Sequence, residues 1–204
     1  DGRLGASNTA AGEVLMSRRF VVILVLVAAF FISVRPASAQ QGVTELGFDM
    51  AIAYETESEI FSVSLPLGGS LAALFGPQGG FRAGFFLGDL VSLEPSLNFQ
   101  LLSGNDETEI AVGSSLRVLY HFSADATHSR FFLAAGPTFT LVDFGSDSST
   151  QFGLNGELGV KLPIADRIGG RLGVGYTRGF ETDDFYTRNI IYATAGLSMF
   201  LGDT

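Results

Sequence analysis

Seven charged residues fall on the polar faces of segments in which apolar and polar residues alternate. They are Asp49, Arg82, Glu94, Arg117, Glu157, Lys161 and Arg171, and their signs are mixed. If the segments enclose a narrow interior, an unpaired charge there is strongly destabilised, so residues of opposite sign should be neighbours. We therefore predict a plug of ion pairs, in which Glu94 lies close to Arg82. A selective path for ions is the alternative chemistry for the same residues.

The two histidines are the candidates for acid–base catalysis near neutral pH. His121 ends a predicted strand and His128 lies in the connection that follows it, so both are predicted to be rim or loop residues. Neither histidine stands at a spacing typical of a metal site. We expect a protein that is not an enzyme and that holds no metal and no cofactor.

The stretch from Val91 to Leu101 sets the pattern for the elements that position these charges. Apolar residues occupy its odd positions and polar residues occupy its even positions. Successive side chains of a strand point to opposite faces, so this stretch has one apolar and one polar face. Its length matches the roughly 9–11 residues of tilted strand that cross a bilayer. The sequence therefore predicts a transmembrane strand here and in the similar segments.

Nine segments show this alternation, whereas a single-chain outer-membrane barrel has an even number of strands and both termini in the periplasm. The tight turn at Gly88-Asp89 is predicted to be periplasmic, so one ascending strand, 46–54, precedes the descending segment 81–87. Segment 61–65 is then the outer part of that descending strand, split by the Gly-rich insertion 67–80, or part of an external loop. We predict an all-β fold, an eight-stranded antiparallel up-and-down transmembrane β-barrel.

Alternation alone does not decide which face points inward. A soluble lipocalin-like barrel that binds an apolar ligand has the same period, with its apolar residues inside. Its outer face should be rich in Lys, Glu and Thr, whereas the polar positions here hold mostly Gly, Ser, Ala and Asn. Small residues fit a crowded interior, so the apolar face is predicted to meet lipid.

Aromatic and proline residues add two local predictions. Four tyrosines near strand ends, Tyr54, Tyr120, Tyr176 and Tyr192, are predicted to form aromatic girdles at the lipid–water interface. Pro95 and Pro137 each remove one donor from a ladder that has no free edge, so we expect a β-bulge at each.

The N-terminal part of the chain reads as a targeting segment. Arg18 and Arg19 precede an apolar run, and Ala37-Ser38-Ala39 supplies the small residues of a cleavage site. We expect residues 1–15 to be an upstream artefact, 16–39 a cleaved signal peptide and 40–204 the barrel domain. The chain has no Cys and a formal charge of −9, which argues against disulfides, lipid attachment at Cys and nucleic acid as a partner.

Several short motifs, in order, resemble those of the outer membrane protein β-barrel domain family, the small OmpA- and OmpX-like barrels. They are Arg82-Ala83-Gly84-Phe85-Phe86-Leu87, Leu93-Glu94-Pro95, Leu119-Tyr120-His121-Phe122, Val160-Lys161-Leu162-Pro163 and Ala195-Gly196-Leu197-Ser198-Met199-Phe200. The resemblance implies an outer-membrane protein that contacts lipopolysaccharide and the barrel assembly machinery. Members that are enzymes carry a His, a Ser and a carboxylate near the outer rim, which neither His121 nor His128 matches.

Fold resemblance does not settle activity, because members of this family differ in function. We expect a monomeric barrel that stabilises the envelope or displays its short loops for interaction. A narrow pore for ions or small solutes is the first alternative, and a secreted soluble barrel is the second. The acidic loops around Glu57, Glu107 and Asp183 are predicted to be solvated surface charge in preference to sites for divalent cations.

Overall fold

The computed structural model describes residues 44–65, 68–69, 79–104, 107–124, 128–143, 148–182 and 186–201. The predicted artefact, signal peptide and most of the insertion lie outside these residues. The strands are β1 (Thr44–Glu55), β2 (Ile60–Leu65), β3 (Gly68–Gly69), β4 (Gly80–Phe86), β5 (Val91–Gly104), β6 (Glu107–His121), β7 (Arg130–Asp143), β8 (Ser148–Ala165), β9 (Ile168–Gly179) and β10 (Arg188–Leu201). Within the described residues, no helix has the length and apolar character needed to cross a membrane.

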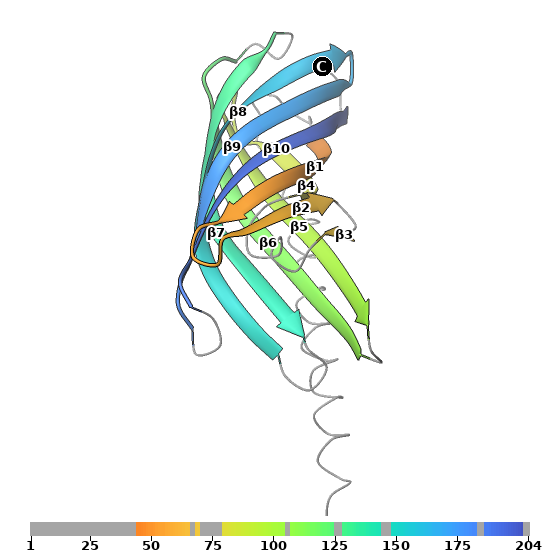
Figure 1. The fold of residues 1–204 in the computed structure, drawn as a ribbon. Coiled ribbons are helices and arrows are strands. Elements are labelled where there is room, and N and C mark those ends of the chain that lie inside the picture. Colours follow the sequence, from red (N-terminus) through yellow and green to blue (C-terminus); the bar gives the residue numbers. More distant parts are fainter. Residues whose placement is uncertain are drawn as a thin grey trace, which may run out of the picture. The chain divides into compact units, whose positions relative to one another are not determined.

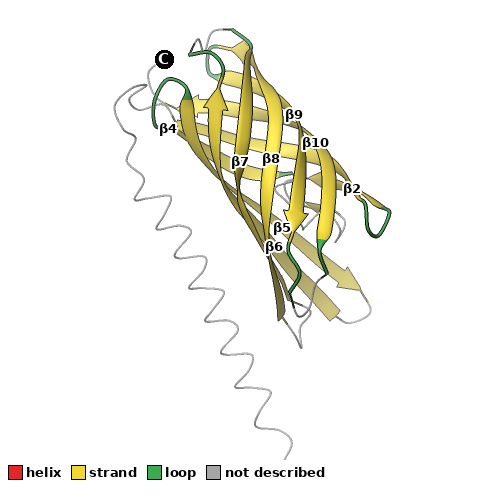
Figure 2. Cartoon of the chain, turned by 90° about the vertical axis from the view of Figure 1, so that its left-hand side faces the viewer, coloured by secondary structure: helices red, strands yellow, loops and turns green. Residues whose placement is uncertain are grey.

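The strands form one closed antiparallel barrel (Figures 1 and 2). Neighbours in sequence pair from β4 through β10, and β10 pairs with β1 along the whole length of β1, from Thr44–Leu201 to Glu55–Ile190. Closure by β1 and β10 leaves no free edge at this seam, as a membrane-spanning sheet requires. The predicted eight-stranded, up-and-down architecture is confirmed.

The second of the eight barrel strands is composite, which explains why the sequence shows nine segments. β2 pairs with the outer part of β1, with Ser64 opposite Ala51, and β4 pairs with the rest, with Gly80 opposite Asp49. The two pieces therefore occupy consecutive places along the same edge of β1. Of the two alternatives for segment 61–65, the structure shows the split descending strand. Gly79 precedes β4 with a φ of 45°, a conformation that suits glycine.

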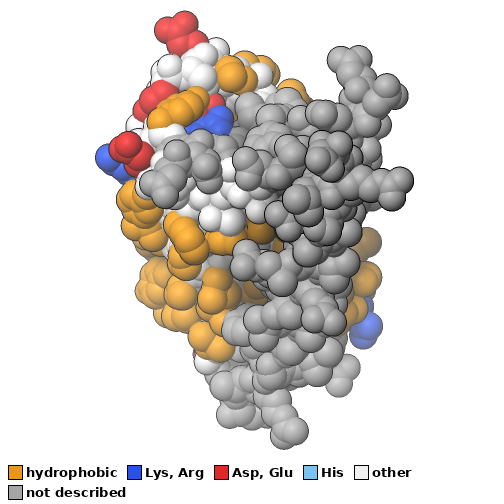
Figure 3. Space-filling view, turned by 90° about the horizontal axis from the view of Figure 1, so that it is seen from below, with side chains coloured by type: hydrophobic (Ala, Val, Ile, Leu, Met, Phe, Trp, Pro, Cys, Tyr) orange, Lys and Arg blue, Asp and Glu red, His pale blue; other side chains and the backbone are white. Residues whose placement is uncertain are grey.

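The apolar row of each strand faces outward. Phe48, Ile52, Val118 and Leu172 expose 41–52% of their surface, whereas Arg117 and Arg171 are buried inside. Figure 3 shows hydrophobic side chains over much of the visible described surface, with acidic side chains gathered at one edge. This orientation is that of a membrane barrel, and it is the reverse of a lipocalin-like soluble barrel.

Pro95 and Pro137 interrupt pairing without changing register, so the predicted bulges at these residues are wrong. β5 keeps one register with β4 on both sides of Pro95, from Phe81–Leu97 to Phe86–Ser92. β7 likewise keeps one register with β6 on both sides of Pro137. Each proline leaves its other neighbour fully paired, because a strand residue donates its N–H to one side only. The register shift that does occur lies between Pro163 and Ala165.

The two ends of the barrel differ in their connections. Thr44 and Leu201 pair at the same end, together with the short β4–β5 and β8–β9 turns. We call this end periplasmic, because outer-membrane barrels place short turns and both termini there. The β1–β2 and β9–β10 connections mark the outer end.

Candidate functional site

Two arginines and two glutamates form the centre of the interior. Arg171 places Nη1 2.8 and 2.7 Å from the two carboxylate oxygens of Glu94, and its Nη2 lies 2.9 Å from Oε1 of Glu157. Arg117 donates from Nη1 to Oε2 of Glu157 over 2.5 Å, and from Nη2 to Glu94. Each guanidinium therefore bridges both carboxylates, and β5, β6, β8 and β9 are tied together across the interior.

A second group of charges adjoins the first. Arg82 donates from Nε to Oδ2 of Asp49 over 2.9 Å and from Nη1 to Oε1 of Glu45 over 2.5 Å. Lys161 lies 2.5 Å from the other oxygen of Glu45. Arg82 also lies 3.5 Å from Glu94, which joins this group to the central one. Four acids and four bases thus form one continuous network in which the formal charges cancel.

All seven residues that the sequence singles out lie on the inner face and take part in this network, and Glu94 lies beside Arg82 as expected. Sequence reasoning missed Glu45, which is fully buried and contacts both Arg82 and Lys161. A signal was available, because Glu45 stands four residues before Asp49 and therefore shares its face of β1.

Aromatic rings fill the interior on the periplasmic side of the charges. Phe86 and Phe132 are 1% and 0% exposed, and the ring of His121 stacks on Phe86 with 5.5 Å between centroids. The guanidinium of Arg171 lies 4.3 Å from the centroid of Phe132, and Lys161 approaches both phenylalanine rings. These cation–π contacts join the aromatic layer to the charged layer.

The structure also brings His121 to Ser92, with Nε2 and Oγ 3.0 Å apart. Both residues are buried, at 0% and 1% exposure, beneath Phe86 and Phe132. Nδ1 of His121 has no hydrogen-bond partner in the described part of the chain, so no carboxylate orients the ring as in a catalytic triad. His121 and Ser92 therefore form a hydrogen bond within the packed aromatic layer. His128 lies two residues before the start of β7 and is exposed, so it is not part of the buried central charges.

Apolar and amide groups fill the interior on the outer side. Ala53, Ala111, Val142, Ile190 and Tyr192 form a buried cluster drawn from four strands. Asn155 donates from Nδ2 to the hydroxyl of Tyr192 over 2.5 Å, and that hydroxyl lies 3.4 Å from Glu157. This layer therefore continues the hydrogen-bond network toward the outer end.

Tyr192 corrects the predicted aromatic girdle. It is 2% exposed and points into the interior, because the even-numbered residues of β10 face inward. The other three tyrosines, Tyr54, Tyr120 and Tyr176, are 41–45% exposed on the outward face. A position near a strand end does not show which way a side chain points. Ile191 belongs to the outward apolar row, so alternation places the next residue, Tyr192, on the inner face.

Side-chain hydrogen bonds also occur at the outer end of the interior. Arg188 donates from Nε and Nη2 to the two oxygens of Glu55. Gln151 donates from Nε2 to the carbonyl oxygens of Phe180 and Tyr186, over 3.1 and 3.0 Å. The described ends of the β9–β10 connection are thus held by β8.

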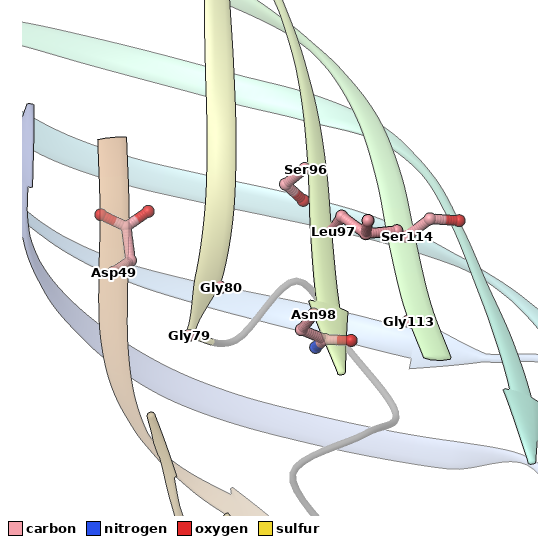
Figure 4. Close-up of a pocket in the computed structure, with 8 residues that line it drawn as sticks. All are labelled: Asp49, Gly79, Gly80, Ser96, Leu97, Asn98, Gly113 and Ser114. Atoms are coloured by element: carbon pink, nitrogen blue, oxygen red, sulfur yellow. The ribbon is translucent and has the colours of Figure 1, made fainter. Parts of the chain in front are cut away.

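A small hollow remains beside the charged network, where β4 resumes the composite strand (Figure 4). It is lined by Asp49, Gly79, Gly80, Ser96, Leu97, Asn98, Gly113 and Ser114, and the volume open to the centre of a water molecule is about 10 Å³. One water molecule needs about 10–15 Å³ by this measure, so the hollow is too small for a larger solute. No group of three or more His, Cys, Asp or Glu residues suited to a metal occurs within the described ranges.

The family comparison agrees with this architecture. The model of the outer membrane protein beta-barrel domain matches residues 22–198. The chain belongs to this family. Membership places the protein among outer-membrane barrels and supports an outer-membrane location. The search of curated proteins found no match.

The chain is similar to several solved structures of outer-membrane proteins. Neisserial surface protein A is 16% identical, has a TM-score of 0.52, and the match covers 78% of this chain and 99% of that one. The N-terminal barrel domain of OprF from Pseudomonas aeruginosa is also 16% identical, with a TM-score of 0.47 and coverage of 78% and 100%. Ail of Yersinia pestis is 10% identical, with a TM-score of 0.45 and coverage of 78% and 99%. At these identities the likeness to surface protein A concerns the fold alone.

Proposed function

We propose that this protein is a sealed outer-membrane barrel with a structural, envelope-stabilising or surface-interaction role. The observation that carries the proposal is that side chains of the described residues occupy the interior at three successive levels. Aromatic rings lie at the periplasmic side, paired charges at the centre, and an apolar cluster and the Glu55–Arg188 pair at the outer side. A barrel of eight strands is just wide enough for side chains to fill, which supports a plug over a pore.

The proposed partners follow from the same architecture. Outer-membrane lipids, including lipopolysaccharide, would contact the apolar belt, and the barrel assembly machinery would insert the chain. We propose a monomer, with no role for nucleic acid and no catalytic activity. The largely apolar outward row and the buried position of His121 and Ser92 support these proposals.

Planar-bilayer conductance tests the sealed interior directly. The refolded chain should give no stable current steps, whereas a double variant, Glu94→Ser with Arg171→Ser, should conduct because it removes two large side chains from the centre. The double variant shows that inserted protein can be detected. Reproducible current steps from the wild-type chain would overturn the proposal and favour the narrow pore.

Insertion must be established before conductance is interpreted. A folded barrel should run faster on a gel when unboiled, and boiling should abolish that band. Protein that stays soluble and monodisperse without detergent would contradict the membrane-barrel assignment.

A further inference from the structure

One arginine breaks the rule that the charges of the strands face inward. Arg178 of β9 lies on the outward row of its strand, and it is exposed. The inward arginines Arg82, Arg117, Arg171 and Arg188 each have a carboxylate partner. The side chain of Arg178 has no ion pair or hydrogen bond to any described residue. Within the described part of the chain, its charge therefore has no partner.

The position of Arg178 along β9 puts it at the outer surface of the membrane. β9 begins at Ile168 at the periplasmic end, and Arg178 is the last outward residue of the strand. At about 3.3 Å per residue and a tilt of about 40°, the ten steps from Ile168 raise Arg178 by about 25 Å along the barrel axis. The apolar band of such barrels is also about 25 Å tall, so the guanidinium reaches the headgroup level.

The neighbours of Arg178 on the same face fit an interfacial site. Tyr176 and Phe180 flank it along the chain, and each is 43% exposed. Aromatic residues prefer this interface, where a charge also costs little. Across the strands, Arg178 stands opposite Leu154 on β8 and Asn189 on β10.

Asn189, the polar neighbour, does not bind the guanidinium of Arg178, because its side-chain amide already forms other hydrogen bonds. Asn189 donates from Nδ2 and from its backbone N to the carboxylate of Glu57, over 2.8 Å for the backbone bond. Its Oδ1 accepts from the hydroxyl of Tyr176. The Glu57 carboxylate is thus turned to Asn189, and no ion pair joins it to Arg178 among the described residues.

We propose that Arg178 binds a phosphate group of an outer-leaflet lipid, such as a phosphate of lipid A. A guanidinium presents several donors in a planar fork that matches phosphate oxygens, which suits this role better than a simple charge. The contact would fix the rotational position of the β8–β10 wall against the lipid surface. The proposal rests on the membrane-barrel function above, and it names the partner and the residue.

Native mass spectrometry of the full refolded chain in neutral detergent tests the proposal with added lipid A. Arg178→Gln should retain lipid A about fivefold less well than the wild type, the factor expected for one basic residue at an anionic surface. Arg178→Lys should recover part of that loss. Arg167→Gln is the matched control, because Arg167 is an exposed arginine in the periplasmic β8–β9 turn and should behave as the wild type.

Two further arms identify the ligand. Dephosphorylated lipid A should bind wild type and Arg178→Gln equally, and millimolar inorganic phosphate should not displace lipid A, since the headgroup source is lipid. Equal retention of lipid A by the wild type and Arg178→Gln would overturn the inference, as would an equal loss in Arg167→Gln. Every variant is first checked for the faster unboiled gel band, so failure of this inference is separable from failure of the barrel itself.

Discussion

The centre of the barrel and its outer rim use the same chemical groups in different surroundings. At the centre, Arg171 and Glu94 are fully buried and bridge four strands through shared partners. At the rim, Glu57 holds Asn189 through similar hydrogen bonds, yet its carboxylate is exposed to water. The Glu55–Arg188 pair is intermediate, because it is buried but lies at the mouth.

Access to solvent determines how much an ion pair contributes to the stability of the fold. A buried charge that loses its partner has no water to replace it, so removal of one partner is strongly destabilising. An exposed charge is solvated at once, and the median exposed pair contributes less than about 1 kcal/mol. The same type of bond should therefore matter less with each step from the centre to the rim.

The largest effect is expected for Arg171→Ala. Glu94 and Glu157 would then share Arg117 in a closed interior, and the free energy of unfolding should fall by about 3–5 kcal/mol. Because the chain has no Trp, the folded fraction is best read from gel mobility across a urea series in lipid vesicles. Arg167→Ala, at the exposed turn, should change stability by less than about 0.5 kcal/mol. A loss below about 1 kcal/mol for Arg171→Ala would contradict a dry centre.

A double variant that removes one acid and one base tests the same dependence on burial. The double variant Glu94→Gln with Arg171→Met keeps the network neutral, whereas either single variant leaves an excess charge. We expect the double variant to be more stable than the sum of the two single effects by at least about 1 kcal/mol. The same urea series measures this coupling, and simple additivity would show that the two residues act independently.

A smaller loss is expected at the mouth. Glu55→Gln removes the charge that Arg188 contacts through two nitrogen atoms. Water can reach Arg188 in part once the pair is broken, so stability should fall by about 1–2 kcal/mol. Comparison with Arg171→Ala under the same conditions tests the gradient, and an equal or larger loss for Glu55→Gln would reverse it.

The smallest effect concerns the pH response of Glu57. Slight burial raises the pKa of its carboxyl, but hydrogen bonds from Asn189 and Thr56 outweigh this and lower the pKa below its ordinary value of 4.5. These bonds stabilise the folded state above about pH 4.5, and their contribution is lost as pH falls through the lower folded pKa. The carboxyl carbon of Glu57 should therefore titrate by NMR below 4.5. Asn189→Ala should move that midpoint upward, and an unchanged midpoint would count against the rim contact.

Specific residues show how far sequence reasoning reaches. Alternation assigned Glu94, Arg117 and Arg171 to the inner face, because a strand has a period of two whatever its surroundings. The same rule could have placed Glu45 and Tyr192 inside, but proximity to a strand end was weighed instead for Tyr192. Arg178 was likewise readable as an outward charge, since it follows Tyr176 by two residues.

The sequence alone predicts the strand pattern, the orientation of the apolar row and seven of the eight charges in the central network. These features depend on local periodicity and on the cost of placing charge or polar backbone in lipid. The folded structure was needed to show that β2 and β4 share one edge of β1, that Pro95 keeps its register, and that Arg171 bridges Glu94 to Glu157. Such partners are distant in sequence, and closure of the barrel is what brings them within hydrogen-bond distance.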